Sequence, residues 1–217
     1  MTVSFGTPMT HHIGYVAKDC EKMARAYERL IGAKFDILPA LQVVTLYDGP
    51  GCIKVAYGAF GGLVVEIIEV VYGDLPHKRW LDTYGEGIQH IGFWVPDPVK
   101  ATADLVAAGG IIEWIADDTN HTAMGYLTPN STQADIVNRM HEDCLSYITA
   151  AGVGNVAIEF LGPKIQGRMI NRWDGEVGDT KTSGSADPQR GGAVSEHPLL
   201  GDLVIAKPDN WFTGQRR

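Results

Sequence analysis

Two histidines occur in nearly the same sequence context and could bind a common ion. His12 begins the run His-Ile-Gly-Tyr-Val-Ala-Lys-Asp, and His90 begins His-Ile-Gly-Phe-Trp-Val-Pro-Asp, 78 residues further on. A motif repeated at such a distance indicates an internal duplication. Both runs alternate as strands do, which puts each imidazole on the same face as the glycine two residues later. A lone histidine on a strand is usually an ordinary core or surface residue, and the repetition weakens that interpretation.

Each copy also offers a glutamate on its last predicted strand. Glu66 and Glu69 point to opposite faces of one strand, and Glu159 projects from the face opposite Ile158. A glutamate within an apolar strand is costly to bury unless it is paired or ligated, although a strand with one side in water remains an alternative. Two imidazoles and one or two carboxylates suit a divalent ion such as Fe, Mn, Co, Ni or Zn. We therefore predict one metal ion held by His12, Glu66, His90 and Glu159.

The elements that must position these side chains form two similar modules. The first, residues 1–72, has a helix that Asp19 can cap and Gly32 can end. Its remaining runs of strand character are 41–47, 52–58 and 63–71. We predict that residues 73–87 are a polar linker.

The second module, residues 88–163, begins with the His90 strand and then a helix that starts at Asp97-Pro98. Strands are predicted at 110–115, 123–128 and 155–161. An added helix is predicted over 131–150, because its apolar residues fall at helical spacing. These residues are Ile136, Met140, Cys144, Tyr147 and Ile148.

The C-terminal extension, residues 164–217, is rich in Gly, Ser, Asp and Thr, and its periodicity is weak. Trp173, Trp211 and Phe212 favour an arm laid on a neighbouring surface over a free tail, because exposed aromatic side chains are costly. Both the added helix and the arm could cover the cleft, or both could pack against a second subunit. Of these alternatives we expect the helix to cover the cleft and the arm to contribute to a homodimer.

The composition of the chain excludes several classes of partner. The net charge of −8 argues against nucleic acid and anionic membranes as partners. No apolar run reaches the ~20 residues of a membrane span, and the three cysteines are far apart, as expected for reduced thiols in the cytoplasm. We therefore expect a cytoplasmic protein whose partner is a small molecule.

The two His-Ile-Gly strands, the Asp-capped helices and the Val-Glu-Ile-Ile and Ala-Ile-Glu-Phe strands resemble the vicinal oxygen chelate superfamily. That group includes glyoxalase I, methylmalonyl-CoA epimerase, extradiol dioxygenases and the fosfomycin and bleomycin resistance proteins. The resemblance covers roughly residues 10–162. It implies an α+β fold in which two paired βαβββ modules form a U-shaped mixed sheet around one metal. It also implies a substrate that chelates the metal through adjacent oxygens.

By resemblance, His12 and His90 match the two histidine ligands, Glu66 the Gln or Glu of the fourth strand, and Glu159 the closing glutamate. This set is most similar to glyoxalase I, whereas Gly87-Ile88-Gln89-His90-Ile91-Gly92-Phe93 is similar to the epimerase. The epimerase's separate glutamate base has no counterpart here, since that region offers only Asp36 and Asp48 as acids.

The resemblance favours an isomerase, epimerase or lyase that acts alpha to a carbonyl through an enediolate. The base would be Glu159 or Glu66. One alternative is an Fe(II) dioxygenase with His12, His90 and Glu159 as a facial triad. A second is a binding or resistance protein of the same fold.

The other histidines have no second potential ligand at a spacing that would indicate a metal site. We expect His11 to face the packing side or solvent, and His77, His121, His141 and His197 to lie at the surface. His121, His141, Tyr126 and Arg168 could still line the cleft.

Overall fold

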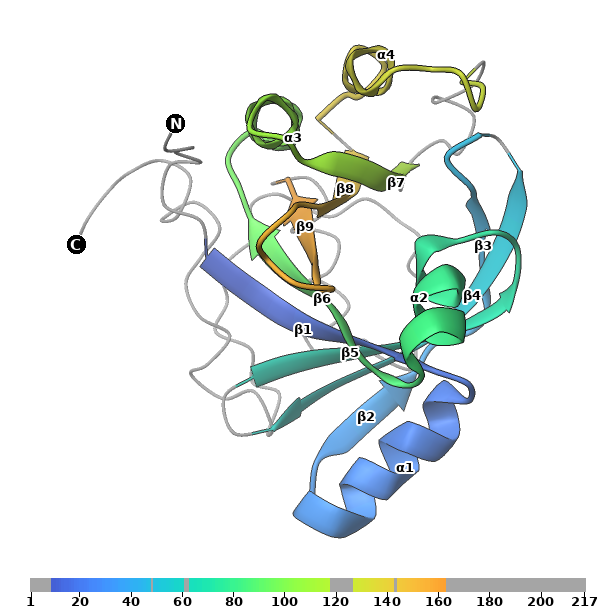
Figure 1. Ribbon diagram of the computed structural model, residues 1–217. Coiled ribbons are helices and arrows are strands. Elements are labelled where there is room, and N and C mark those ends of the chain that lie inside the picture. Colours follow the sequence, from blue (N-terminus) through green and yellow to red (C-terminus); the bar gives the residue numbers. More distant parts are fainter. Residues whose placement is uncertain (1–8, 48, 61–62, 118–126, 143, 163–217) are drawn as a thin grey trace, which may run out of the picture.

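The computed structural model describes residues 9–47, 49–60, 63–117, 127–142 and 144–162 (Figure 1). The first module contains β1 (Met9–Ala17), α1 (Cys20–Ile31), β2 (Lys34–Ile37), β3 (Leu41–Val44), β4 (Pro50–Phe60) and β5 (Leu63–Tyr72). Helix α2 (Pro76–Tyr84) follows it within the predicted linker. The second module contains β6 (Gly87–Trp94), α3 (Pro98–Ala107), β7 (Ile111–Asp117), α4 (Gln133–Val137), β8 (Cys144–Thr149) and β9 (Ala157–Leu161).

The strands of the described residues form one mixed sheet in the order β2-β4-β5-β1-β6-β9-β8-β7, and β3 pairs with β4. At its centre β1 and β6 run antiparallel, and each is flanked by the parallel last strand of its own module, β5 or β9. The two modules are thus joined edge to edge through their histidine strands. The predicted α+β class with paired modules is confirmed.

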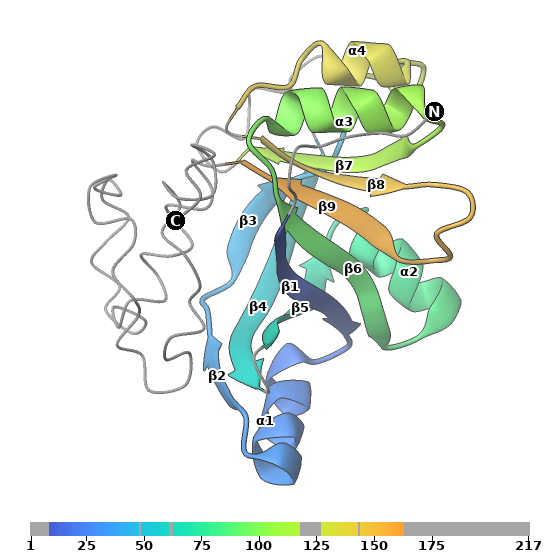
Figure 2. The same cartoon turned by 90° about the vertical axis from the view of Figure 1, so that its left-hand side faces the viewer.

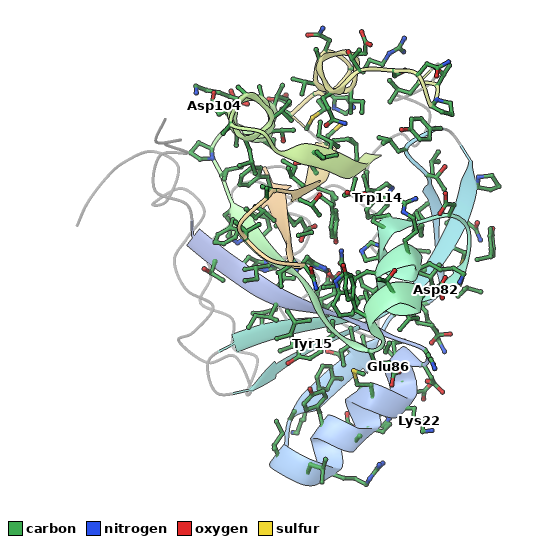
Figure 3. The ribbon with its side chains drawn as sticks, viewed as in Figure 1. Tyr15, Lys22, Asp82, Glu86, Asp104 and Trp114 are labelled. Atoms are coloured by element: carbon green, nitrogen blue, oxygen red, sulfur yellow. The ribbon has the colours of Figure 1, made fainter. Side chains whose placement is uncertain are left out.

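The sheet curls so that its two halves, one from each module, face a common interior (Figures 1 and 2). Ile53 and Val55 of β4 pack in one cluster with Trp114 of β7 and Tyr147 of β8. Trp114 points inward from β7 (Figure 3), and its Nε1–H donates to the carbonyl oxygen of Val44 at 2.9 Å. Contacts between the two halves of the sheet therefore enclose its inner face.

The two longest helices cover the outer face, and their starts agree with the sequence. Asp19 caps α1 by accepting from the Lys22 amide, and Asp97 caps α3 by accepting from the Lys100 amide. Gly32, with φ of 71°, ends α1 in the left-handed conformation that favours glycine. Helix α1 buries Cys20 and Ala24 against the outer side of the first module, and α3 buries Ala101 and Leu105 against the second. The helices therefore occupy the outer face of both modules, whereas the inner face carries buried polar side chains as well as apolar ones.

The prediction of a helix over residues 131–150 is wrong for most of that range. Helix α4 spans five residues, and Cys144–Thr149 form β8, which pairs with β7 on one side and β9 on the other. Cys144 and Ile148 pack beneath α3, while Tyr147 packs on the inner face. A strand covered on both faces is apolar on both faces, so its pattern resembles a buried helix.

Two further elements add to what the sequence predicts. The predicted linker contains α2, and β2 is a strand that the sequence did not indicate. Residues 123–126 of the predicted strand 123–128 lie outside the described residues, and residues 127–128 are not in a strand. The whole extension 164–217 also lies outside the described residues. The module boundaries stay a prediction. Within the described part of the chain, no helix has the length and apolar character needed to cross a membrane.

Candidate metal centre

Four strands at the middle of the sheet each contribute one predicted ligand to the inner face. They are β1 with His12, β5 with Glu66, β6 with His90 and β9 with Glu159. One nitrogen or oxygen of each side chain lies within 4.8 Å of the others, and all four residues are buried. The structure thus brings together the whole predicted set, while its binding of a metal stays a prediction.

The sheet register explains how these side chains meet. Reading across neighbouring strands, Tyr57, Glu66, Gly14 and His90 form one row. A second row with the same residue types, Tyr147, Glu159, Gly92 and His12, runs across the other module. Each histidine therefore lies opposite the glycine of the other module. Across that glycine it faces the glutamate of the other module.

The two glycines are required by this close approach. A Cβ atom at Gly14 would lie 1.8 Å from Cε1 of His90, and one at Gly92 would lie 2.3 Å from Cε1 of His12. Across these gaps His90 Nε2 lies 3.1 Å from Glu66 Oε2, and His12 Nε2 lies 2.9 Å from Glu159 Oε2. The shortest histidine–carboxylate contacts therefore join the two modules.

The donor atoms fit a divalent cation. The two Nε2 atoms are 3.0 Å apart, and adjacent ligands of an ion bound at 2.0–2.2 Å are separated by roughly 3 Å. Two carboxylates and two imidazole nitrogens pointing at one another repel unless a positive charge lies among them. Glu159 Oε2 is also buried without a hydrogen-bond partner. An N₂O₂ set of this kind suits a first-row divalent ion.

The shifted pKa values of His12 and Glu66 also support a cation at this position. Burial by itself lowers the pKa of His12, but the Glu159 and Glu66 carboxylates outweigh it and raise that pKa to about 10. The pKa of Glu66 lies well below its usual value, because hydrogen bonds from His12 and His90 outweigh burial. Both shifts show that this pocket favours a positive charge, which a bound cation would supply.

A sequence profile described as the glyoxalase/bleomycin resistance protein/dioxygenase superfamily matches residues 11–126. The chain belongs to this superfamily. The matched segment includes His12, Glu66 and His90, whereas Glu159 lies beyond it, so the structure alone brings Glu159 to the site. No curated protein sequence matched the chain.

Several solved structures are similar at low identity. A hypothetical protein from Bacillus halodurans C-125 is 16% identical with a TM-score of 0.44, over 71% of this chain and 94% of its own. Methylmalonyl-CoA epimerase from Mycobacterium tuberculosis is 17% identical with a TM-score of 0.43, over 72% and 90%. A mutant of 4-hydroxymandelate synthase from Streptomyces coelicolor is 16% identical with a TM-score of 0.42, over 70% and 48%. Likeness at this level says nothing about the reaction.

Sequence reasoning missed the tyrosine of each row in this member of the superfamily. The Tyr57 hydroxyl donates to Glu66 Oε1, and Tyr147 lies across from Glu159 in the sheet. Burial, followed by the nearby Glu159 and Glu66 carboxylates, raises the pKa of Tyr147 well above its usual value. The sequence does contain a signal, because each glutamate follows a tyrosine across a hairpin, but the helix predicted over 131–150 obscures the one at Tyr147.

His77 is the other residue that the sequence did not reveal. It lies on the first turn of α2, is fully buried, and packs its ring against those of His90, Trp114 and Tyr147. The expectation that it lies at the surface is wrong. Both of its ring nitrogens lack a hydrogen-bond partner. Together with Glu159 Oε2 they complete the set of unpartnered buried side-chain N and O atoms in the described residues, and all three belong to this interior.

Two of the other histidines, His11 and His141, lie within the described residues. His11 is half-buried and contacts His12 and Trp94, so the expectation that it faces away from the site is wrong. His141 is half-buried after α4. His121, His197, Tyr126 and Arg168 lie outside the described residues.

Proposed function

We propose that this superfamily member is a metal-dependent isomerase, epimerase or lyase that moves a proton alpha to a carbonyl group. The observation that carries the proposal is the buried convergence of His12, Glu66, His90 and Glu159. The ion is one of Fe, Mn, Co, Ni or Zn, since the donor set does not distinguish among them. The substrate is a small molecule with two adjacent oxygens.

A divalent ion held there would supply Lewis acidity to the two substrate oxygens and stabilise negative charge next to the carbonyl. His12 and His90 would serve as fixed nitrogen ligands from the two modules. Glu66 is restrained through Oε1 by Tyr57, which leaves Oε2 to face the histidines. These three residues bind and orient and need not move.

Glu159 is the better candidate for the base. Its Oε2 has no hydrogen-bond partner, whereas Tyr57 holds Glu66. Glu159 would have to leave the ion for its carboxylate to take the alpha proton and return it, and Glu66 is the second candidate for this role. The buried rings of Tyr147 and Trp114 would exclude water during the transfer.

The metal centre is tested first by metal analysis of protein purified without chelators. The wild type should hold one divalent ion per chain, and His12→Ala and His90→Ala should each lose it. His141→Ala, which changes a half-buried histidine outside the cluster, is the matched control and should keep the ion. Full metal content in both ligand variants would contradict the site.

The reaction is tested by deuterium exchange from D₂O into 2-hydroxy ketones, thiohemiacetals and acyl-CoA compounds. Exchange should occur without oxygen and with Zn in the site. In Glu159→Gln, which keeps a ligating oxygen, exchange should fall by about 10²–10⁴-fold. Turnover that requires O₂ and ferrous iron, without exchange, would support the dioxygenase instead. Binding of these compounds without any exchange or turnover would support a binding protein.

A further inference from the structure

The two central strands each contain one irregular residue, and in both it directly precedes the predicted metal ligand. Along β1 and β6 the pairing passes from Thr10↔Phe93 to His12↔Gly92, so His11 has no partner. It also passes from Gly14↔His90 to Tyr15↔Ile88, so Gln89 has none. These are β-bulges, and the duplication has placed them at equivalent positions of the two modules.

A bulge changes the direction of its side chain. In a regular strand the residue before a ligand points to the opposite face, whereas here both bulged side chains turn toward the inner face. His11 Nδ1 lies 2.7 Å from His12 Nδ1, and Gln89 Oε1 lies 2.7 Å from His90 Nδ1. Gln89 is almost fully buried, and the His11 ring lies 4.3 Å from that of Trp94.

We propose that His11 and Gln89 are positioning residues that fix the tautomer and ring orientation of the two histidine ligands. The carbonyl oxygen of Gln89 can only accept, so His90 carries a proton on Nδ1, and Nε2 is the nitrogen left to bind the metal in place of a proton. His11 acts in the same way when its Nδ1 accepts from the Nδ1–H of His12. Groups that hold the second ring nitrogen of a metal-bound histidine increase the affinity for the metal.

The two modules reach this arrangement with different chemistry. An imidazole nitrogen accepts or donates according to tautomer, whereas an amide oxygen only accepts. His90 is therefore locked by Gln89, while His12 depends on a partner that must itself be in the correct tautomer. A glutamine in place of His11 would supply the same fixed acceptor that the second module uses.

The test measures Co(II) binding to the full chain by titration, with the visible absorption of the bound ion as a second readout. Gln89→Leu and His11→Phe keep bulk and remove the acceptor, so the dissociation constant for Co(II) should rise by about 10–100-fold. Gln89→Glu and His11→Gln keep an acceptor oxygen and should bind as the wild type does. Gln42→Leu makes the same change at an exposed position on β3 and should have no effect.

Imidazole ¹⁵N chemical shifts of the metal-free protein give a readout that general loosening of the fold would not move. They should show protonated Nδ1 at His90 in the wild type and a mixture of tautomers in Gln89→Leu. Unchanged Co(II) affinity in Gln89→Leu and His11→Phe would overturn the inference, as would equal losses in the Glu and Gln variants. The inference rests on the metal centre and not on the reaction. A wild type that binds no Co(II) would overturn both the metal centre and this inference, whereas normal binding without exchange activity would overturn the proposed reaction alone.

Discussion

At the scale of single residues, the centre depends on two positions without a side chain. Gly14 and Gly92 each leave the space that the opposite module's imidazole occupies on its way to a carboxylate. The glycines therefore determine which carboxylate each histidine reaches. Their role is steric, since neither has the positive φ that would require glycine on conformational grounds.

Gly14→Ala should therefore disrupt metal binding without touching a ligand. The new methyl group would overlap the ring of His90, which must turn away from Glu66. We expect loss of stoichiometric Co(II) together with destabilisation of about 1–3 kcal/mol. Thermal unfolding and metal analysis check this.

Gly87→Ala on β6 is the control, because its Cβ would contact only the tip of Trp80 at 3.3 Å. It should keep its metal and nearly all of its stability. A Gly14→Ala protein with full metal content would show that His90 does not need this space.

At the scale of elements, the sequence was most informative where a strand has one buried face or a helix has a cap. The alternation in β1 and β6 and the Asp caps of α1 and α3 correctly predicted those elements. Periodicity failed at β8, where both faces are covered. The bulges at His11 and Gln89 shift side chains by one position, which strict alternation cannot anticipate.

The sequence also failed to predict that His77 of helix α2 is buried, and this burial has a measurable consequence. Burial, followed by the charge of His90, lowers the pKa of His77 from 6.5 to about 3. The unfolded chain therefore takes up this proton first as the pH falls. The stability that neutral His77 contributes is fully present above pH 6.5 and is lost as the pH falls from 6.5 toward 3.

Between about pH 7.5 and about pH 5, wild type should lose roughly 2 kcal/mol more unfolding free energy than His77→Leu. Urea denaturation of both proteins at the two values measures this difference. Gln42→Leu, which replaces an exposed side chain that does not titrate, serves as the control and should follow the wild type. Equal losses in wild type and His77→Leu would show that His77 can be protonated in the folded state.

For the molecule as a whole, the candidate metal centre lies at the junction of the two modules. Each module supplies one histidine, one glutamate, one glycine and one tyrosine, and the closest pairs cross from one module to the other. A bound ion would therefore fasten the modules together, and its binding free energy would add to their stability. A homodimer and a cytoplasmic location stay predictions.

The last prediction concerns the chain beyond β9. The ligands and the tyrosines and bulge residues that support them all lie between His11 and Glu159. A protein that ends at Gly162 should therefore bind one metal ion with wild-type affinity, as Co(II) titration would show. The aromatic residues beyond that point predict that the shortened chain will associate less, or bind substrate more weakly, which mass in solution and deuterium exchange would detect. Loss of the metal on truncation would mean that residues after Gly162 help to build the site, whereas unchanged mass and exchange would make the extension dispensable.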